Sequence, residues 1–83
     1  MDIEKLNWIK GGKYRSIILK LLSKNPMLPS EIAAALSITR ASSSRILRSM
    51  EREGLVERTK SRTRTITYFL TKDAYDILQN LQE

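Results

Sequence analysis

Residues 29–55, which read PSEIAAALSITRASSSRILRSMEREGL, predict two helices joined by a short turn. Pro29 suits the first position of a helix, where the N–H that proline lacks would have no partner in any case. Thr39 is a good N-cap for the second helix, which we expect to run over about residues 40–53 and to end at Gly54. Two helices joined in this way, with the second one longer and basic, describe a helix-turn-helix.

Each helix of the pair has an apolar stripe that predicts its buried face. In the first helix the stripe consists of Ile32, Ala35 and Leu36. In the second helix Leu47 and Met50 face the core, so Ser43, about one turn earlier, is expected to face inward as well.

The segments upstream of this pair also have helical character. Apolar residues follow the i, i+3, i+4, i+7, i+8 spacing of a one-sided helix at Tyr14, Ile17, Ile18, Leu21 and Leu22. A short helix over residues 2–10 is expected before it, and Gly11–Gly12 separates the two.

Downstream, the period of the apolar residues changes from helical to alternating. Ile66, Tyr68 and Leu70 alternate with their neighbours, which indicates a strand, and residues 55–59 indicate a shorter one. Residues 60–63 then form the basic tip of a hairpin. Thr71 is expected to cap a last helix, whose apolar face consists of Ala74, Ile77, Leu78 and Leu81.

The predicted fold is therefore mainly α with a β-hairpin (α+β). It is a winged helix-turn-helix, in the order helix, helix, helix, hairpin, helix, with a possible extra N-terminal helix. We assign residues 1–12 to an N-terminal helical extension and residues 13–83 to the winged helix-turn-helix domain.

Composition narrows the classes of function. The chain has 83 residues and a net charge of +6, and residues 40–64 alone hold eight lysines and arginines against three glutamates. Such an excess fits a polyanionic partner. Without cysteine or histidine, the chain lacks the usual zinc ligands and the commonest catalytic bases, so we expect no metal, no cofactor and no enzyme activity.

The sequence also bears on location. No apolar run approaches the ~18 residues of a membrane span, and the N-terminus MDIEKLNWIK has no signal-peptide pattern. We therefore expect a cytoplasmic, nucleoid-associated protein with no membrane partner.

Two stretches, PSEIAAALSITRASSSRILRSMEREGLVER and YFLTKDAYDIL, carry a resemblance to a known family. Over about residues 14–82 the chain resembles winged helix-turn-helix transcriptional regulators of the MarR/ArsR type, especially the small archaeal ones. The resemblance implies a DNA-binding regulator, with the recognition helix (about 40–53) in the major groove and the basic wing (about 58–64) on the minor groove or phosphates.

The chain departs from the family pattern at three positions. Leu28 stands where the family often has a Thr or Ser N-cap. Ser37 stands at a turn position that is often Gly, and a serine held at positive φ there would cost about 1–2 kcal/mol. Ser43 replaces a core aliphatic residue, and we expect this to weaken the anchoring of the recognition helix.

Small and basic residues share the outer face of the predicted recognition helix. A helix that enters the ~12 Å major groove needs small residues where it approaches the bases and long donors where it reaches them. The residues expected to contact DNA from this helix are Arg40, Ala41, Ser42, Ser44, Arg45 and Arg48. The alternative is a solvated helix face with no partner.

The hairpin supplies a second set of basic residues, namely Arg58, Lys60, Arg62 and Arg64. Neighbouring arginines on strands repel each other, so a compensating anion accounts for them, although they would also block edge-strand pairing. A weaker candidate is Ser30, near a helix N-terminus that a phosphate would favour.

A homodimer is expected because two half-sites about 34–36 Å apart need two modules. Its interface is expected to use the apolar residues Ile3, Leu6, Trp8, Leu78 and Leu81, which would otherwise close the core of the monomer. Nothing in the sequence indicates a small-molecule effector.

Two other functions remain open beside sequence-specific regulation. A non-specific architectural or chromatin protein would bind random and promoter DNA with similar affinity. A protein-interaction winged helix would keep its function after charge reversal at Arg45 and Arg62.

Overall fold

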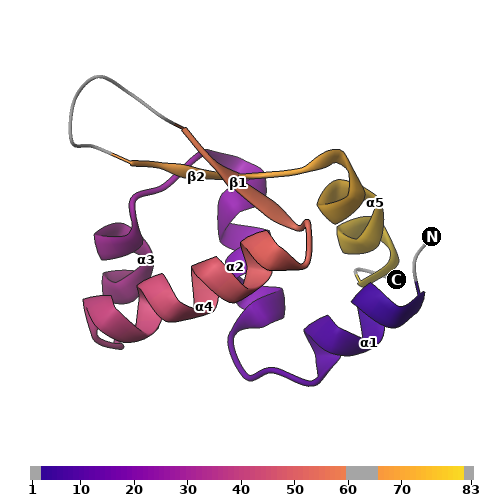
Figure 1. Cartoon of the computed structure of the whole chain (residues 1–83), viewed down its shortest axis with the longest axis horizontal. Coiled ribbons are helices and arrows are strands. Elements are labelled where there is room, and N and C mark those ends of the chain that lie inside the picture. The colour runs from indigo at the N-terminus through magenta and orange to yellow at the C-terminus, as the bar shows by residue number, and fades with distance from the viewer. Residues whose placement is uncertain (1–2, 60–65, 82–83) are drawn as a thin grey trace.

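The computed structural model describes residues 3–59 and 66–81, and this part of the chain forms five helices and one antiparallel hairpin (Figure 1). In chain order the elements are α1 (Ile3–Lys10), α2 (Arg15–Lys24), α3 (Pro29–Leu36), α4 (Arg40–Arg52), β1 (Val56–Arg58), β2 (Tyr68–Leu70) and α5 (Lys72–Leu81). The predicted fold class and element order are therefore confirmed, including the extra N-terminal helix.

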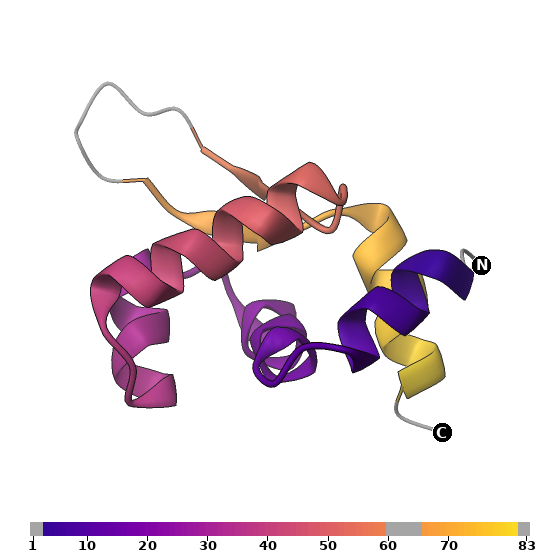
Figure 2. The same ribbon diagram turned by 60° about the horizontal axis from the view of Figure 1, so that its bottom comes forward.

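The elements are arranged around α2. Figure 2 shows α2 between the α3–α4 pair and the end of the molecule that carries α1, α5 and both termini. Direct contacts join α3 to α4, and α2 to α1, β2 and α5. The α3–α4 pair thus packs against the rest of the domain on one side and is open to solvent on the other.

The predicted capping residues begin and end the helices as expected. Thr39 Oγ1 accepts a hydrogen bond from the Ser42 backbone N–H at 3.0 Å and so caps α4. At the other end of α4, Gly54 has φ +75°, a conformation that glycine adopts at little cost. Leu28 cannot cap α3 with its side chain, but Glu31 Oε1 accepts the Leu28 backbone N–H at 2.9 Å.

The turn between α3 and α4 holds the strained serine that the sequence predicts. Ser37 has φ 57° and ψ 42°, the left-handed region, and it is the one non-glycine residue at positive φ in the described part of the chain. Its N–H bonds the Ala34 carbonyl at 3.3 Å, and the Ile38 N–H bonds the Ala33 carbonyl at 3.0 Å. The change of chain direction between α3 and α4 therefore depends on the left-handed conformation of Ser37.

Replacing Ser37 with glycine is expected to raise the free energy of unfolding by about 0.5–1 kcal/mol. Glycine removes the ~1–2 kcal/mol cost of the left-handed conformation. Because glycine loses more backbone entropy on folding than serine does, about 0.5–1 kcal/mol of that gain is offset. Urea denaturation followed by circular dichroism measures the difference. Ser37→Ala is the matched control because it keeps the strain, and equal stability of the two variants would contradict the prediction.

The core is built by one face of every helix and by the hairpin. Two expected stripes are wrong in detail. In α2, Leu19 is fully buried whereas Ile17 is 44% exposed, because α2 has neighbours on several sides and buries a wider, rotated arc. In α3, Ile32 and Leu36 contribute to the core as expected, but Ala33 is buried in place of Ala35, which is exposed, so the buried face is rotated part of a turn from the predicted one.

The two strands are shorter than predicted, and β2 has an additional partner. Val56 pairs with Leu70 and Arg58 with Tyr68. On the other side of β2, Tyr68 exchanges two backbone hydrogen bonds with Met27, at 2.8 and 3.1 Å. This bridge, absent from the sequence expectations, ties the base of the hairpin to the segment before α3.

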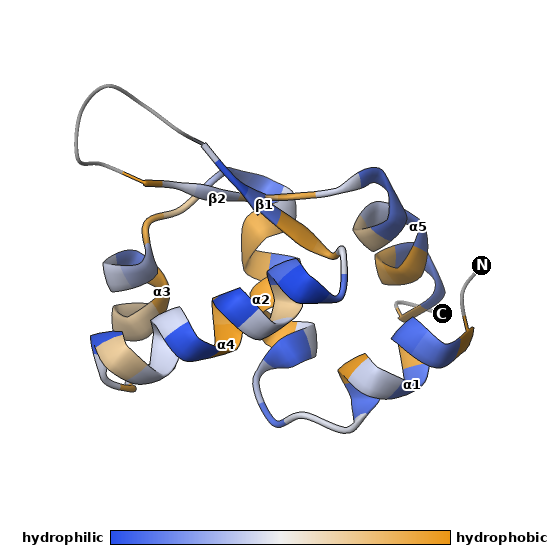
Figure 3. Cartoon of the chain, viewed as in Figure 1, coloured by the Kyte–Doolittle hydropathy of each residue, from blue (hydrophilic) through white to orange (hydrophobic). Residues whose placement is uncertain are grey.

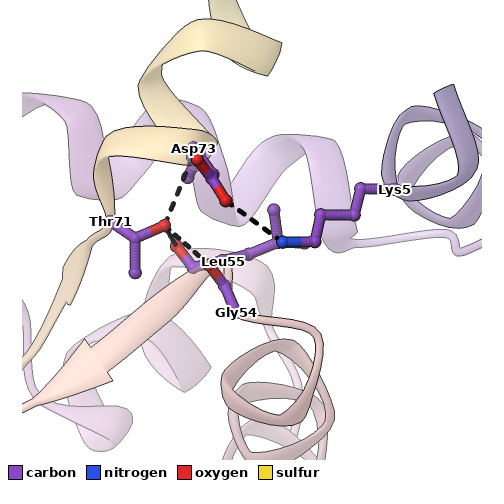
Figure 4. A network of polar contacts seen from close by, with 6 residues as sticks. Lys5, Gly54, Leu55, Thr71 and Asp73 are labelled. Atoms are coloured by element: carbon purple, nitrogen blue, oxygen red, sulfur yellow. Dashed lines mark hydrogen bonds and ion pairs between the residues drawn. The ribbon is translucent and has the colours of Figure 1, made fainter. Parts of the chain in front are cut away.

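A polar network holds the turn between α4 and β1 (Figure 4). Thr71 Oγ1 donates to the Gly54 carbonyl oxygen at 2.7 Å and accepts the Ala74 N–H at 3.3 Å, which confirms Thr71 as the cap of α5. Lys5 Nζ lies 3.2 Å from Asp73 Oδ2 and so links α1 to the same region. These contacts connect the turn after α4 to the start of α5, and they connect α1 to α5.

Candidate nucleic-acid interface

Helix α4 presents one polar face to solvent and one apolar face to the core. Its 13 residues span about 20 Å at 1.5 Å per residue. Ser43, Leu47 and Met50 are buried, and hydrophilic positions recur along the opposite surface (Figure 3). The expected contact residues lie on that surface: Arg40, Ala41, Arg45 and Arg48 are exposed, and Ser42 and Ser44 are partly exposed.

Ser43 connects α4 to α3 through a buried hydrogen bond. It is completely buried, and its Oγ donates a hydrogen bond to the Pro29 carbonyl oxygen at 2.8 Å. The inward orientation predicted for Ser43 is therefore confirmed, and the hydroxyl group forms a bond to the start of α3 where the family has aliphatic packing; the weaker anchoring of α4 stays a prediction.

The other hydroxyl groups at the start of α4 have distinct partners. Thr39 Oγ1 donates to Ser42 Oγ at 2.9 Å, so the Ser42 hydroxyl proton remains able to donate outward. Ser44 makes no side-chain hydrogen bond within the described residues. Hydroxyl groups of this kind donate to phosphates or to base edges.

The arginines of the outer face lack acidic neighbours. Among the residues that the structure describes, Arg40, Arg45 and Arg48 have no carboxylate oxygen within 4.0 Å. Because a guanidinium group is always charged and carries five donors, this face offers strong, uncompensated donors to an anion.

A groove runs between the second half of α4 and β1, and Figure 1 shows these elements side by side. It encloses about 610 Å³ and is lined by Arg45, Arg48, Glu51, Arg52 and Arg58. Glu51 Oε2 lies 3.4 Å from Arg58 Nε, which joins helix and hairpin. Arg52 and Glu51 were not among the residues expected at this surface, although the charge run and the helical spacing of 45, 48 and 52 indicate a common face.

The remaining predicted contact residues separate into two groups. Ser30 is partly exposed in the first turn of α3, where Glu31 is turned back to the Leu28 N–H. Lys60, Arg62 and Arg64, with the predicted hairpin tip, lie outside the described residues. The last described pair before that tip is Thr59 with Thr67, whose Oγ1 atoms are 3.0 Å apart.

The predicted dimer residues gather at the end of the molecule formed by α1 and α5. Ile3 is 64% exposed, whereas Leu78 is 5% exposed and belongs to the core. Leu6, Trp8 and Leu81 are partly buried against that core. The Arg15 guanidinium stacks on the Trp8 ring, 3.6 Å from its centroid.

The described residues contain no group of three or more acidic side chains placed to hold a metal ion. Within the same residues, none of the helices is both long and apolar enough to span a membrane. On the α4 surface, the exposed arginines and the hydroxyl groups beside them offer ionic and hydrogen-bonding contacts to an anion.

A family model described as the MarR family matches residues 15–64, from the start of α2 into the hairpin. No curated protein matches the chain.

Solved structures share the fold. A protein from Enterococcus faecalis, described as a transcriptional regulator of the MarR family, is 26% identical with a TM-score of 0.86, over 96% of this chain and 76% of its own. The adhesin competence repressor AdcR from Streptococcus pyogenes is 25% identical with a TM-score of 0.78, over 86% of this chain and 55% of its own.

A third structure, ZitR from Lactococcus lactis in complex with DNA, is 23% identical with a TM-score of 0.72, over 77% of this chain and 45% of its own. At that identity the likeness shows the fold alone. The chain spans about half the length of AdcR and ZitR.

Proposed function

The family model matches more than half of the chain, so the chain belongs to the MarR family, and from this premise we propose that it is a DNA-binding transcriptional regulator. One observation carries the proposal: α4 exposes small residues and arginines that have no acidic partner in the described part of the chain on one face, while its other face is buried in the core. ZitR, which has the same fold, has been solved with DNA.

The recognition helix α4 enters the major groove of duplex DNA. Ala41 and Ser44 are small enough for the helix backbone to approach the bases, and Arg40 and Arg45 reach their edges. Arg48, about one turn further along, meets a backbone phosphate. A polyanion accounts for a stretch that places eight basic residues against three acidic ones over residues 40–64.

The basic wing contributes contacts that do not depend on sequence. Arg58, Lys60, Arg62 and Arg64 bind the minor groove or its phosphates. Ser30 and the N-terminus of α3 add a contact with the backbone.

Replacing Arg62 with alanine is expected to weaken binding to all duplexes alike. The plot of log affinity against log salt concentration has a negative slope, and loss of one phosphate contact makes this slope shallower by about 0.9. Fluorescence anisotropy at several salt concentrations measures the slope. An unchanged slope would contradict contact between the wing and a phosphate.

The regulator acts as a homodimer in the cytoplasm, bound to two half-sites. Among the described residues Ile3 is the most exposed large apolar residue, and it lies at the α1–α5 end of the molecule together with the partly buried Leu6, Trp8 and Leu81. Sedimentation equilibrium measures the mass in solution, and a monomer at all concentrations would exclude this assembly.

Titration of the protein with duplex DNA tests the proposed function. Bound fragments are first selected from the source genome and sequenced, and their affinity is compared with that of random duplexes at one stated salt concentration. A regulator binds its site at least ~10³-fold more tightly. A ratio near one would instead support an architectural protein, and no association at low salt would exclude both.

A further inference from the structure

The groove between α4 and β1 carries a net positive charge, and it lies beside the half of α4 that is proposed to face the bases. Four arginines and one glutamate line it, which gives a local charge of +3. Within residues 3–59 and 66–81, Glu51 pairs with Arg58 and with no other basic side chain. Arg45, Arg48 and Arg52 have no acidic side chain within 4.0 Å in the described part of the chain.

Arg48 and Arg52 are one helical turn apart and line the groove together with Arg58 from β1. Like charges at this spacing destabilise an isolated helix by a few tenths of a kcal/mol. An anion between them would remove the repulsion, and guanidinium groups match the oxygen geometry of phosphate. The Glu51 contact engages Nε of Arg58 and leaves its terminal nitrogens available.

Taking the proposed function as the premise, we propose that this groove binds a phosphate of the DNA backbone, held by Arg48, Arg52 and Arg58. Arg52 is a contact beyond those assigned under the proposed function, and Glu51 is a counter-charge that weakens the site. In this arrangement the first half of α4 faces the bases. The second half of α4 and the hairpin bind the DNA backbone next to those bases.

The groove is open, so a flexible acidic segment of a protein would satisfy the same charges. Its continuity with the base-facing surface favours DNA, because Arg45 belongs to both. One duplex therefore reaches the two surfaces together.

The Arg52→Ala variant tests the site by the salt dependence of binding to the selected duplex. Because the salt slope falls by about 0.9 for one lost phosphate contact, the affinity ratio of the wild-type protein to the variant should decrease about 3.5-fold between 50 and 200 mM salt. Lys20→Ala is the matched control, since Lys20 is exposed on α2 and its removal changes the net charge equally. Thermal melts confirm that both variants fold.

The Glu51→Gln variant tests the same site by an expected increase in DNA affinity. Glutamine keeps nearly the size and shape of glutamate, but the negative charge near the phosphate is gone, so affinity should rise about threefold at low salt for a charge about 6 Å away in a water-like dielectric. A misfolded variant would not bind more tightly.

The outcomes separate the two proposals. If Arg52→Ala matches Lys20→Ala at every salt concentration and Glu51→Gln binds like the wild type, the groove does not hold phosphate, while the proposed function stands. If the wild-type protein fails to bind any duplex at low salt, both proposals fall.

Discussion

Replacing Leu47 with alanine is expected to lower the free energy of unfolding by about 2–5 kcal/mol. Leu47 is fully buried in the middle of α4 and belongs to the single core cluster of the described residues. A domain of 83 residues has a total stability of roughly 4–12 kcal/mol. The variant should therefore lose a large share of its stability, and DNA binding should be lost at a lower temperature than in the wild-type protein.

Urea denaturation followed by circular dichroism measures this loss. Ile17→Ala is the matched control, because Ile17 is as large and aliphatic as Leu47 but 44% exposed on α2, and its loss should be under ~1 kcal/mol. If Leu47→Ala and Ile17→Ala were equally stable, α4 would not be anchored by the face that the structure buries.

The sequence predicts most of this fold because its boundaries are set by local chemistry. Thr39, Gly54 and Thr71 act within one or two turns of their own position, through a hydroxyl group or a positive φ angle. Ser37 has the strained conformation expected from the turn it occupies. Such signals need no knowledge of distant contacts.

The errors arise where distant segments decide the outcome. Periodicity allows neighbouring stripes on α2 and α3, and only the placement of the surrounding elements selects Leu19 over Ile17 and Ala33 over Ala35. The Met27–Tyr68 bridge joins positions far apart in the chain, and no local pattern marks it.

The candidate site shows the same division. The outer face of α4 follows from helical spacing once Leu47 and Met50 are placed in the core. The groove beside it depends on how β1 crosses the end of α4, which brings Arg58 to Glu51. The role of Ser43 also depends on tertiary structure, since its partner is the Pro29 carbonyl group of another helix.

Replacing Arg45 with alanine is expected to lower affinity for the selected site by about 1–3 kcal/mol, or roughly 5- to 150-fold, and to relax base preference. Arg45 is exposed on α4 with no acidic neighbour among the described residues, so its guanidinium group is available to a guanine edge in the proposed complex. Random duplexes should lose much less, because their binding depends on the phosphates.

Arg45→Lys separates base reading from charge. Lysine keeps the positive charge but lacks the rigid pair of donors that matches a guanine edge, so this variant should retain affinity for random DNA and lose most of the preference for the selected site. Parallel titrations of both duplexes at one salt concentration give the ratio, with Lys20→Ala as the variant that removes a charge from an exposed position on α2. Equal losses on both duplexes for Arg45→Ala, restored by lysine, would assign Arg45 to a phosphate and leave base recognition to Arg40 and the serines of α4.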